Sequence, residues 1–407
     1  MEQTLPLAGL KVVELATVVA GPAAGRILAG YGASVVKIEN PGAGDLLRPY
    51  GQGHCLPTEP GNNPLFDVYN TGKQLVSVNL KTSEGKEVFH RLLADADIFL
   101  TNVRMPSLVR MGIGYEALKE KFPRLIYAHL SGYGLEGPDK DSPGFDMSAF
   151  WARTGASLDW ELPGSFPIRP TFGFGDTVTA AHFLSGILMA LYGRSSTGRG
   201  TLVSSSLMAA GIWSNSSYIL NSQPQYGRQF PVDRYLPWDP FSDYYQCGDG
   251  PWMTVIAKSY PADRPTFARI FDLPELMSDP DCETLDKLHK SGKDKGVAQK
   301  MERYFATKTY DEWVKILTEN DVAFARLRHF KEVHADGQAW ANGCFEEAAY
   351  PDGCKTAIPM PPIVFSEYGR RQFAKTGGIG SDTDAVLTGL GYDAAAIAAL
   401  REKGVLG

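Results

Sequence analysis

The sequence predicts an α/β fold, with a Rossmann-like, mostly parallel sheet in a large domain and a smaller α+β domain. Short β-branched runs alternate with helical stretches through the first 130 residues. This alternation is typical of parallel sheets that carry helices on both faces. The chain has 407 residues, and single hydrophobic cores stop growing at roughly 250–300 residues. Two domains are therefore expected.

The expected strands of the large domain are short apolar runs. They lie at 10–15, 34–38, 75–80, 97–100 and 124–130. Helices are expected over 23–31 and 83–94, where apolar side chains recur at helical spacing. Pro22 at the start of the first helix and Gly32 just past its end agree with the usual preferences at helix termini.

The remaining chain is expected to complete the large domain and to add the small one. A largely apolar helix is expected over 176–192, and another over 394–400. Between them lies a stretch rich in proline and aromatic residues, which is typical of a linker. The expected parts are 1–222 for the N-terminal part of the large domain, 223–250 for the linker, 251–330 for the small domain, and 331–407 for a return linker and the C-terminal part of the large domain.

Composition excludes several classes of partner. The formal net charge is −6 without a block of like charges, which argues against nucleic acid or an anionic membrane. The five cysteines form no C-x-x-C pair, so a disulfide framework or zinc site is not expected and a reducing cytoplasm fits. The N-terminus lacks the basic and apolar runs of a signal peptide. The longest uncharged run, 201–227, is too polar for a membrane span.

The turn after the first strand lacks the glycines of a dinucleotide site. Residues 16–22 have the sequence Ala-Thr-Val-Val-Ala-Gly-Pro, without the G-x-G-x-x-G that lets a backbone approach a pyrophosphate. A second glycine pair at 378–380 follows no convincing strand. The sequence therefore predicts a Rossmann-like architecture without NAD or flavin.

The segment before the long apolar helix is the strongest candidate for chemistry. Gly173 and Gly175 alternate directly before Asp176. One interpretation is that Asp176 only caps the helix. A cap does not require the two glycines, whereas close approach of a ligand to the backbone does. A carboxylate at a helix N-terminus is also stabilised as the anion, which suits a nucleophile near neutral pH. Both interpretations stay open at this point.

Motifs along nearly the whole chain resemble the class III CoA-transferases, the family of formyl-CoA transferase and carnitine CoA-transferase. The matching segments, in the family's order, are 7–22, 28–41, 70–73, 80–86, Asn102, 110–112, 131–134, 175–176, 197–200 and 380–387. No single motif would suffice, but their shared order is specific.

The resemblance implies transfer through Asp176. Its carboxylate would attack the thioester of a donor acyl-CoA, giving a mixed anhydride and CoA thiolate. The thiolate would return to the aspartyl carbonyl, leaving an aspartyl-CoA thioester, and an acceptor carboxylate would repeat the steps in reverse. Each step exchanges acyl bonds of similar energy. The resemblance therefore implies CoA esters as substrates, with no metal, NAD or tightly bound cofactor.

The resemblance also implies the residues around CoA. The expected CoA contacts are Val18, Val19, Ala20, Lys73, Asn102, Val103, Arg104, Arg110 and Lys140. Lys73 and Arg110 have the charge to hold phosphates, although both could be solvated surface cations. The expected lining of the active site is Tyr50, Phe145, Gly173 and Gly175. Members of the family form a homodimer of two interlocked chains, and the same is expected here.

The expected acyl group is bulky and apolar. Val19 and Phe145, near its implied position, disfavour a small dianion such as oxalate. The chain looks closest to transferases of amino-acid fermentation that act on (R)-2-hydroxy acids such as phenyllactate or 2-hydroxyisocaproate. A 2-methylacyl-CoA racemase of the same fold is one alternative, but Phe145 replaces the histidine of such enzymes and cannot exchange an α-proton. A catalytically inactive CoA-binding protein is the other alternative.

Overall fold

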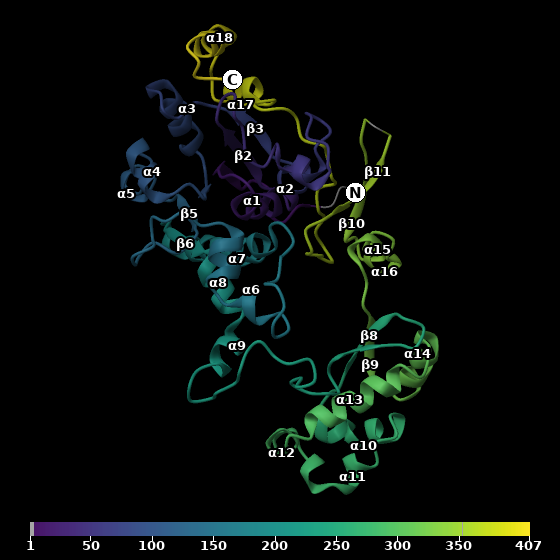
Figure 1. Ribbon diagram of the computed structural model, residues 1–407. Helices are drawn as coiled ribbons and strands as arrows, with labels where there is room; N and C mark the ends of the chain where they lie inside the picture. The colour runs from purple at the N-terminus through teal and green to yellow at the C-terminus, as the bar shows by residue number, and fades with distance from the viewer. Residues whose placement is uncertain (1–3, 352) are drawn as a thin grey trace. The chain divides into compact units, whose positions relative to one another are not determined.

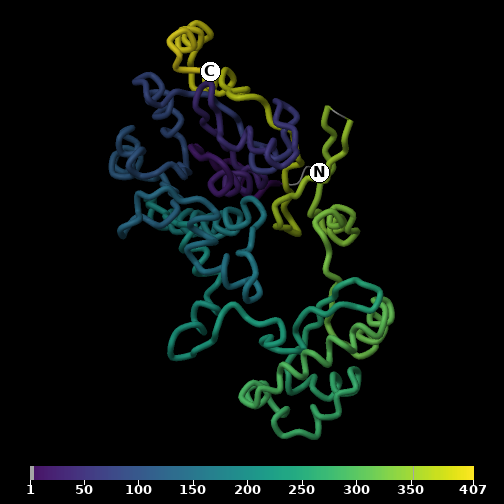
Figure 2. Tube along the Cα trace, in the orientation of Figure 1, coloured from purple at the N-terminus to yellow at the C-terminus, as the bar shows by residue number. Residues whose placement is uncertain are grey.

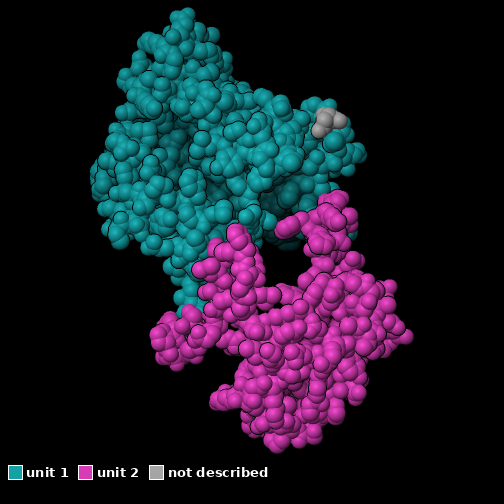
Figure 3. Space-filling view, in the orientation of Figure 1, with its two compact units in different colours: residues 1–156, 169–220, 336–407 teal, residues 157–168, 221–335 magenta. Residues whose placement is uncertain are grey.

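The computed structural model describes residues 4–351 and 353–407. It divides into two compact units, which Figure 3 distinguishes by colour. Unit 1 comprises the chain up to Ala156, Arg169–Leu220 and Asp336–Gly407, and unit 2 comprises Ser157–Ile168 and Asn221–Ala335. The domain boundaries expected at 222, 250 and 330 stay a prediction.

Unit 1 is built on a six-stranded parallel sheet (Figure 1). Its strands are β1 (Lys11–Leu15), β2 (Ser34–Glu39), β3 (Gln74–Ser77), β4 (Ile98–Thr101), β5 (Ile126–Ser131) and β6 (Leu202–Ser206). The spatial order is β3-β2-β1-β4-β5-β6, and every neighbouring pair is parallel. This is the strand order of doubly wound Rossmann folds, which reverses between β1 and β4. The predicted α/β fold is confirmed.

The helices of unit 1 connect and cover these strands. They are α1 (Ala20–Gly30), η1 (Tyr50–His54), α2 (Pro64–Asn70), α3 (Ser83–Leu93), α4 (Met105–Met111), α5 (Tyr115–Leu118), η2 (Asp146–Ala152), α7 (Phe174–Thr197), α8 (Leu207–Ser214), α16 (Gly337–Ala341), α17 (Thr383–Gly389) and α18 (Ala394–Glu402). Helices α6 (Ala156–Asp159) and α9 (Ser216–Asn221) cross the boundaries between the units. Helix α1 begins at Ala20 and contains Pro22 in its first turn. A proline is tolerated there, because the N–H that it lacks would have no acceptor within the helix.

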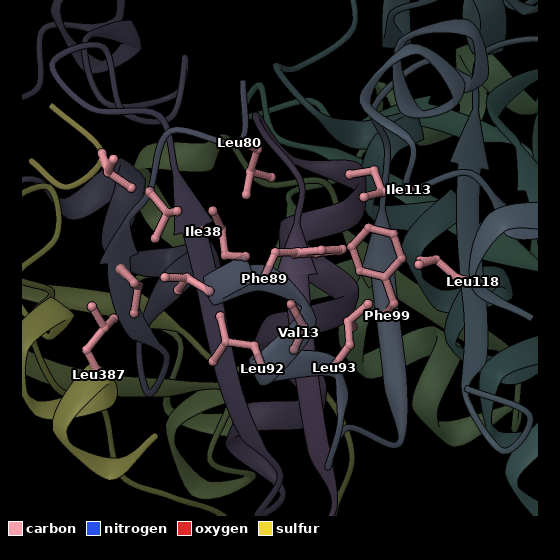
Figure 4. Packing of buried hydrophobic residues seen from close by; sticks show 14 of the residues in the cluster. Val13, Ile38, Leu80, Phe89, Leu92, Leu93, Phe99, Ile113, Leu118 and Leu387 are labelled. Carbon is pink, nitrogen blue, oxygen red and sulfur yellow. The ribbon is translucent and has the colours of Figure 1, made fainter. Parts of the chain in front are cut away.

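The main core of unit 1 lies between the sheet and α3. Figure 4 shows Phe89 of α3 among buried side chains of the sheet, with Leu387 of α17 in the same cluster. The rings of Phe89 and Phe99 meet edge to face at 5.2 Å. Each fully buried side chain of this size contributes about 1.5–3 kcal/mol to folding.

The C-terminal segment completes this unit beside β3 (Figure 2). Leu75 N–H donates to Asp382 Oδ2 at 2.8 Å, and Ser77 N–H donates to Thr383 Oγ1 at 3.0 Å. A short antiparallel hairpin of β10 (Phe345–Ala349) and β11 (Lys355–Pro359) precedes this segment. Both ends of the described chain therefore contribute to unit 1.

Unit 2 is a smaller α+β unit. Its antiparallel sheet has the order β7-β8-β9, formed by β7 (Tyr244–Gln246), β8 (Trp252–Ile256) and β9 (Ala323–Arg326). Its helices are α10 (Tyr260–Ile270), α11 (Glu275–Ser278), η3 (Pro280–Cys282), α12 (Leu285–Ser291), α13 (Asp294–Phe305), α14 (Tyr310–Glu319) and α15 (Phe330–Val333). Buried aromatic rings dominate its core; Phe305 and Trp313, for example, lie 4.6 Å apart.

Helix α7 is long and apolar enough to cross a membrane by length and composition alone. Part of it, however, is core: Phe183, Leu184 and Ile187 are buried within unit 1. The core helix of a globular protein meets the same criteria of length and composition. We therefore assign α7 to the core of unit 1.

Candidate active site

A cavity of about 830 Å³ lies in unit 1 at the carboxyl edge of the parallel sheet. Its lining includes Thr17, which follows β1, Asn102, which follows β4, and Gly132, which follows β5. The strand order reverses between β1 and β4, so the loops that follow these strands diverge and leave a crevice. Ligands of open α/β sheets bind at this place.

Most of the residues expected to bind CoA, to line the active site or to act in catalysis line this cavity. They are Val18, Val19, Ala20, Asn102, Arg104, Lys140, Phe145 and Asp176. The expected residues that lie outside its lining are Tyr50, Lys73, Val103, Arg110, Gly173 and Gly175. The topology thus brings together segments that are far apart in the sequence.

Asp176 presents a nearly buried carboxylate to the cavity. It is the third residue of α7 and is 8% exposed. The N-cap position belongs to Gly173, which has a φ of 73°. Within the described residues, α7 has no side-chain cap, and burial and the charge of Asp146 act on the Asp176 carboxylate without a hydrogen bond. The capping interpretation is therefore wrong, and the lone pairs of this carboxylate are not engaged by the protein.

The two glycines before Asp176 allow protein groups to pack closely against α7. A Cβ at Gly175 would lie 2.2 Å from Asp146 Oδ1 and 2.4 Å from Phe150 Cγ. A Cβ at Gly173 would lie 3.2 Å from both methyl groups of Val19. The groups that approach these glycines in the structure are side chains of unit 1, and the approach of a ligand to the backbone stays a prediction.

Asp146 and Asp176 share one poorly hydrated environment. Burial raises the pKa of Asp176 to about 7, and the negative charge of Asp146 adds to the effect. Burial raises the pKa of Asp146 to about 6, although the N–H groups of Gly175 and Gly173 face its carboxylate and oppose the rise. Burial and both carboxylates raise the pKa of Tyr69 to about 12. The carboxylate pair therefore carries less than two full charges at pH 7.

The turn between β1 and α1 is fixed by side chains on two neighbouring segments. Thr17 N–H donates to Asn102 Oδ1 at 2.9 Å, and Asn102 Nδ2 donates to Thr17 O at 2.8 Å. Val18 N–H donates to Asp45 Oδ1 at 2.9 Å. Asn102 therefore lies in the cavity wall, but its amide group joins the ends of β1 and β4.

Lys73 corrects a prediction. Its side chain is 0% exposed, and its ammonium contacts Glu14 Oε2 at 2.8 Å, Pro22 O at 2.8 Å and Asn70 Oδ1 at 3.0 Å. An ammonium has three N–H donors, so none remains for a phosphate. Lys73 is neither a phosphate contact nor a solvated surface cation here, but part of a buried ion pair.

The other expected contacts differ in their surroundings. Arg104 and Lys140 are exposed cations of the lining, so they have the charge and the access to meet phosphates. Arg110 lies on α4 outside the lining and donates to Ser107 Oγ at 2.8 Å. Val103 O contacts His129 Nε2 at 3.0 Å. The Tyr50 ring in η1 lies 5.3 Å from the ring of Phe172.

His129 is a lining residue that the sequence did not single out. Burial lowers its pKa and so favours the neutral form of the ring. Nε2 contacts a carbonyl, and the buried Nδ1 has no partner within the described part of the chain. Leu46, Val109 and Leu202 add apolar surface to the lining. None of these residues lies in a motif with a chemical signature.

The described residues form no cluster of metal ligands at this site. Among the residues that the structure describes, no group of three His, Cys, Asp or Glu side chains could hold a metal ion. The cavity instead offers apolar walls, the exposed cations Arg104 and Lys140, the exposed acidic residues Glu116 and Asp141, and the nearly buried Asp176. The cations can hold phosphates, and the apolar walls can hold the other parts of a ligand.

Known proteins are similar to this chain along nearly its whole length. The family model described as "CoA-transferase family III" matches residues 7–383. The (R)-2-hydroxy-4-methylpentanoate CoA-transferase of Clostridioides difficile is 35% identical over 389 residues, which are 95% of this chain and 96% of that protein. The cinnamoyl-CoA:phenyllactate CoA-transferase of Clostridium sporogenes is 36% identical over 385 residues, 94% of this chain and 93% of that protein. A CAIB/BAIF family protein from Brucella suis shares the fold, with a TM-score of 0.76 at 24% identity, over 95% of this chain and 100% of that one.

Proposed function

The chain belongs to CoA-transferase family III, and we propose that it moves CoA between an acyl-CoA and a free carboxylic acid with Asp176 as the nucleophile. The nearly buried, unpartnered carboxylate of Asp176 in the cavity at the sheet edge carries this proposal. Enzymes of this family use CoA esters as substrates. A carboxylate without hydrogen bonds keeps its lone pairs available for attack on a thioester.

The proposed steps follow the chemistry of acyl exchange. Asp176 in its ionised form attacks the thioester carbon of the donor. CoA thiolate leaves from the tetrahedral intermediate, and a mixed anhydride of Asp176 and the donor acid forms. The thiolate then attacks the aspartyl carbonyl, the donor acid leaves, and an aspartyl-CoA thioester remains for the acceptor. Val19 and Ala20 at the start of α1 line the same cavity. N–H groups at a helix start lack intrahelical acceptors, so they can stabilise the oxyanions of these steps.

We propose that CoA lies along the cavity wall formed by the β1–α1 turn and the segment after β4. The proposed contacts in the lining are Val18, Val19, Ala20, Asn102, Arg104 and Lys140. Arg104 and Lys140 would meet phosphates by charge. Val103 and Arg110 lie beyond the lining and remain candidates for the nucleotide end, and Tyr50 remains a candidate near the acyl end.

We propose a bulky 2-hydroxy acid, aryl or branched, as the acid substrate. The names of the two relatives include phenyllactate and (R)-2-hydroxy-4-methylpentanoate. Leu46 and Phe145 are exposed apolar side chains of the lining, and a bulky apolar acid would cover them. Such a substrate is consistent with a role in amino-acid fermentation.

We propose that the enzyme works as an interlocked homodimer. In unit 1, α7 and α8 expose large apolar side chains, among them Tyr192 at 83% and Trp213 at 71%. Monomers rarely leave such groups of side chains in water. A second copy of the chain would cover them.

We also propose a cytoplasmic enzyme without a tightly bound cofactor. Cys55 and Cys344 are exposed and form no disulfide within the described residues, which suits a reducing compartment. Acyl exchange needs no redox group, and acyl-CoA and the free acid are the proposed partners.

The aspartyl-CoA adduct tests this function directly. The full-length protein is incubated with cinnamoyl-CoA alone, and its intact mass is measured. We expect a CoA adduct on the wild type and on Asp286→Ala, a change of an exposed aspartate in unit 2, but none on Asp176→Ala. CoA binding without an adduct in the wild type would contradict the mechanism and favour an inactive CoA-binding protein. Deuterium wash-in at the α-carbon of 2-methylacyl-CoA without an acceptor would favour the racemase.

A further inference from the structure

Val18 has an unusual backbone conformation for its residue type. Its φ is 66°, in the left-handed region. The other non-glycine residues described with positive φ are Cys55, Asp272 and Asp321, and none of these is β-branched. A β-branched residue is a genuine outlier there, because its Cβ substituents crowd the backbone. Such strain persists only where surrounding groups hold it, and it is concentrated at functional sites.

The carboxylate of Asp45 contacts the backbone of Val18. Its Oδ1 accepts the Val18 N–H and the Leu47 N–H, both at 2.9 Å. Its Oδ2 lies 2.7 Å from Lys37 Nζ. The side chains of Asp45 and Lys37 are completely buried. Hydrogen bonds to a buried, charge-paired carboxylate are among the stronger ones in proteins.

Lys37 is in turn held from the other side. Its ammonium donates to Glu14 Oε1 at 3.0 Å and to Ala16 O at 2.6 Å. Glu14 also contacts Lys73 at 2.8 Å. The side chains of Asp45, Lys37, Glu14 and Lys73 therefore contact one another in a buried network, which holds the Asp45 carboxylate beside the β1–α1 turn.

The strained turn lies directly against the segment that carries Asp176. Val18 and Val19 line the cavity together with Asp176. The methyl groups of Val19 lie 3.2 Å from the position of a Cβ on Gly173, the N-cap of α7. A change of φ at Val18 would rotate the following residues, Val19 and Ala20, and would move them relative to α7.

We propose that Asp45 is a positioning residue of the transfer site: it holds Val18 in the left-handed conformation and thereby keeps the start of α1 in place against Asp176. The inference rests on the proposed function for its effect on catalysis. The coupling of Asp45 to Val18 is independent of that function. Glycine adopts positive φ without the steric cost of valine, so a glycine at this position no longer needs Asp45.

A double-variant cycle tests the proposal. Asp45→Asn, Val18→Gly and their combination are compared by the rate of adduct formation from cinnamoyl-CoA and by the unfolding midpoint of the ligand-free protein. We expect Asp45→Asn to slow adduct formation about tenfold in the wild-type background. In the Val18→Gly background, Asp45→Asn should slow adduct formation by less than about threefold. It should also lower the unfolding midpoint less than it does in the wild-type background.

Asp321→Gly is the matched control, because Asp321 is exposed and has positive φ, but lies in unit 2. Asp45→Asn should keep its tenfold effect in that background. Equal losses in the Val18→Gly and wild-type backgrounds would overturn the proposal. If Asp45→Asn folds only in combination with Val18→Gly, this rescue supports the proposal. If neither the single nor the double variant folds, Asp45 does not act through Val18 and the proposal fails. A wild type without transfer activity would refute the proposed function, and the unfolding midpoints would still decide the coupling.

Discussion

The Asp146 carboxylate lies against the first turn of α7 and raises the pKa of Asp176. Asp146 begins η2, and Asp176 is the third residue of α7. Gly175 permits their approach, because any Cβ there would collide with Asp146 Oδ1. Together with burial, this arrangement brings the pKa of Asp176 to about 7, where a proton can leave the nucleophile under physiological conditions.

The rate of adduct formation should therefore depend on pH through Asp176. With a pKa of about 7, the attacking carboxylate is protonated below pH 7 and ionised above it, so the rate should rise through pH 7 and level off. Asp146→Asn removes the neighbouring charge and should shift the rising limb to lower pH. Single-turnover rates over a pH series measure this, with Asp286→Asn as the control. A limb that stays in place in Asp146→Asn would contradict the electrostatic coupling.

Ionisation of the buried Asp176 carboxylate should lower the stability of the folded protein at alkaline pH. Because its pKa is raised in the folded state, the native protein binds more protons than the unfolded chain between about pH 4 and pH 7, and stability falls as pH rises through this window. Asp176→Asn cannot ionise, so we expect it to be more stable than the wild type at pH 8 by roughly 2–4 kcal/mol. The difference should shrink toward pH 5. Urea unfolding at both pH values measures this difference in stability. If Asp176→Asn is no more stable than the wild type at pH 8, ionisation of Asp176 does not destabilise the folded protein.

The sheet was predictable because its signal is local. Short β-branched runs at β1, β2, β4 and β5 are typical of strands buried on both faces. Two strands differ clearly. The strand β6 (Leu202–Ser206), which is mostly serine, was not predicted, and β3 ends at Ser77 although the apolar run continues to 80. There Val78 forms a bridge with Leu406 from the other end of the chain. A contact between residues so far apart in the sequence cannot be predicted from the local spacing of apolar residues.

The site was predictable only in part, because motifs do not show where a side chain is directed. Lys73 fits a motif, but its ammonium is buried against Glu14. The partner of Lys37 could have been anticipated in part from the sequence. A lysine within a strand that is buried on both faces requires a charged partner. Its partner Asp45 lies in a loop, and only the folded chain brings the two together.

The buried network around Lys37 should be essential for stability. Lys37→Met leaves Asp45 as an uncompensated buried charge and leaves Glu14 with Lys73 alone, and removal of one partner from a buried pair costs about 3–5 kcal/mol. Lys290→Met breaks an exposed pair with Asp286 and should change stability little. Urea unfolding of both variants gives the comparison. Similar stability of the two variants would show that the network is dispensable.

The exposed apolar side chains of α7 and α8 should determine the oligomeric state. A charge at a position that is covered in a dimer must be desolvated without a partner, so we expect Tyr192→Arg and Trp213→Arg to give monomers. Glu402→Arg, on the exposed surface of α18, should leave the assembly unchanged. Light scattering after size-exclusion chromatography measures the mass in solution. A monomeric wild type, or variants that remain dimeric, would contradict an interface at these positions.

Phe145 should select the acid substrate. Its side chain is 59% exposed and lines the cavity with Asp176, so a bulky acid gains contact with it and a small acid does not. Phe145→Ala should lower kcat/KM about tenfold for phenyllactate, and less for acetate. Leu158→Ala, at a similarly exposed position outside the lining, should change neither value. Initial rates with both acids separate two roles of the ring. A loss confined to the bulky acid is expected for an apolar contact in the transition state, whereas equal losses would mean that Phe145 only supports the site and that substrate selection lies elsewhere.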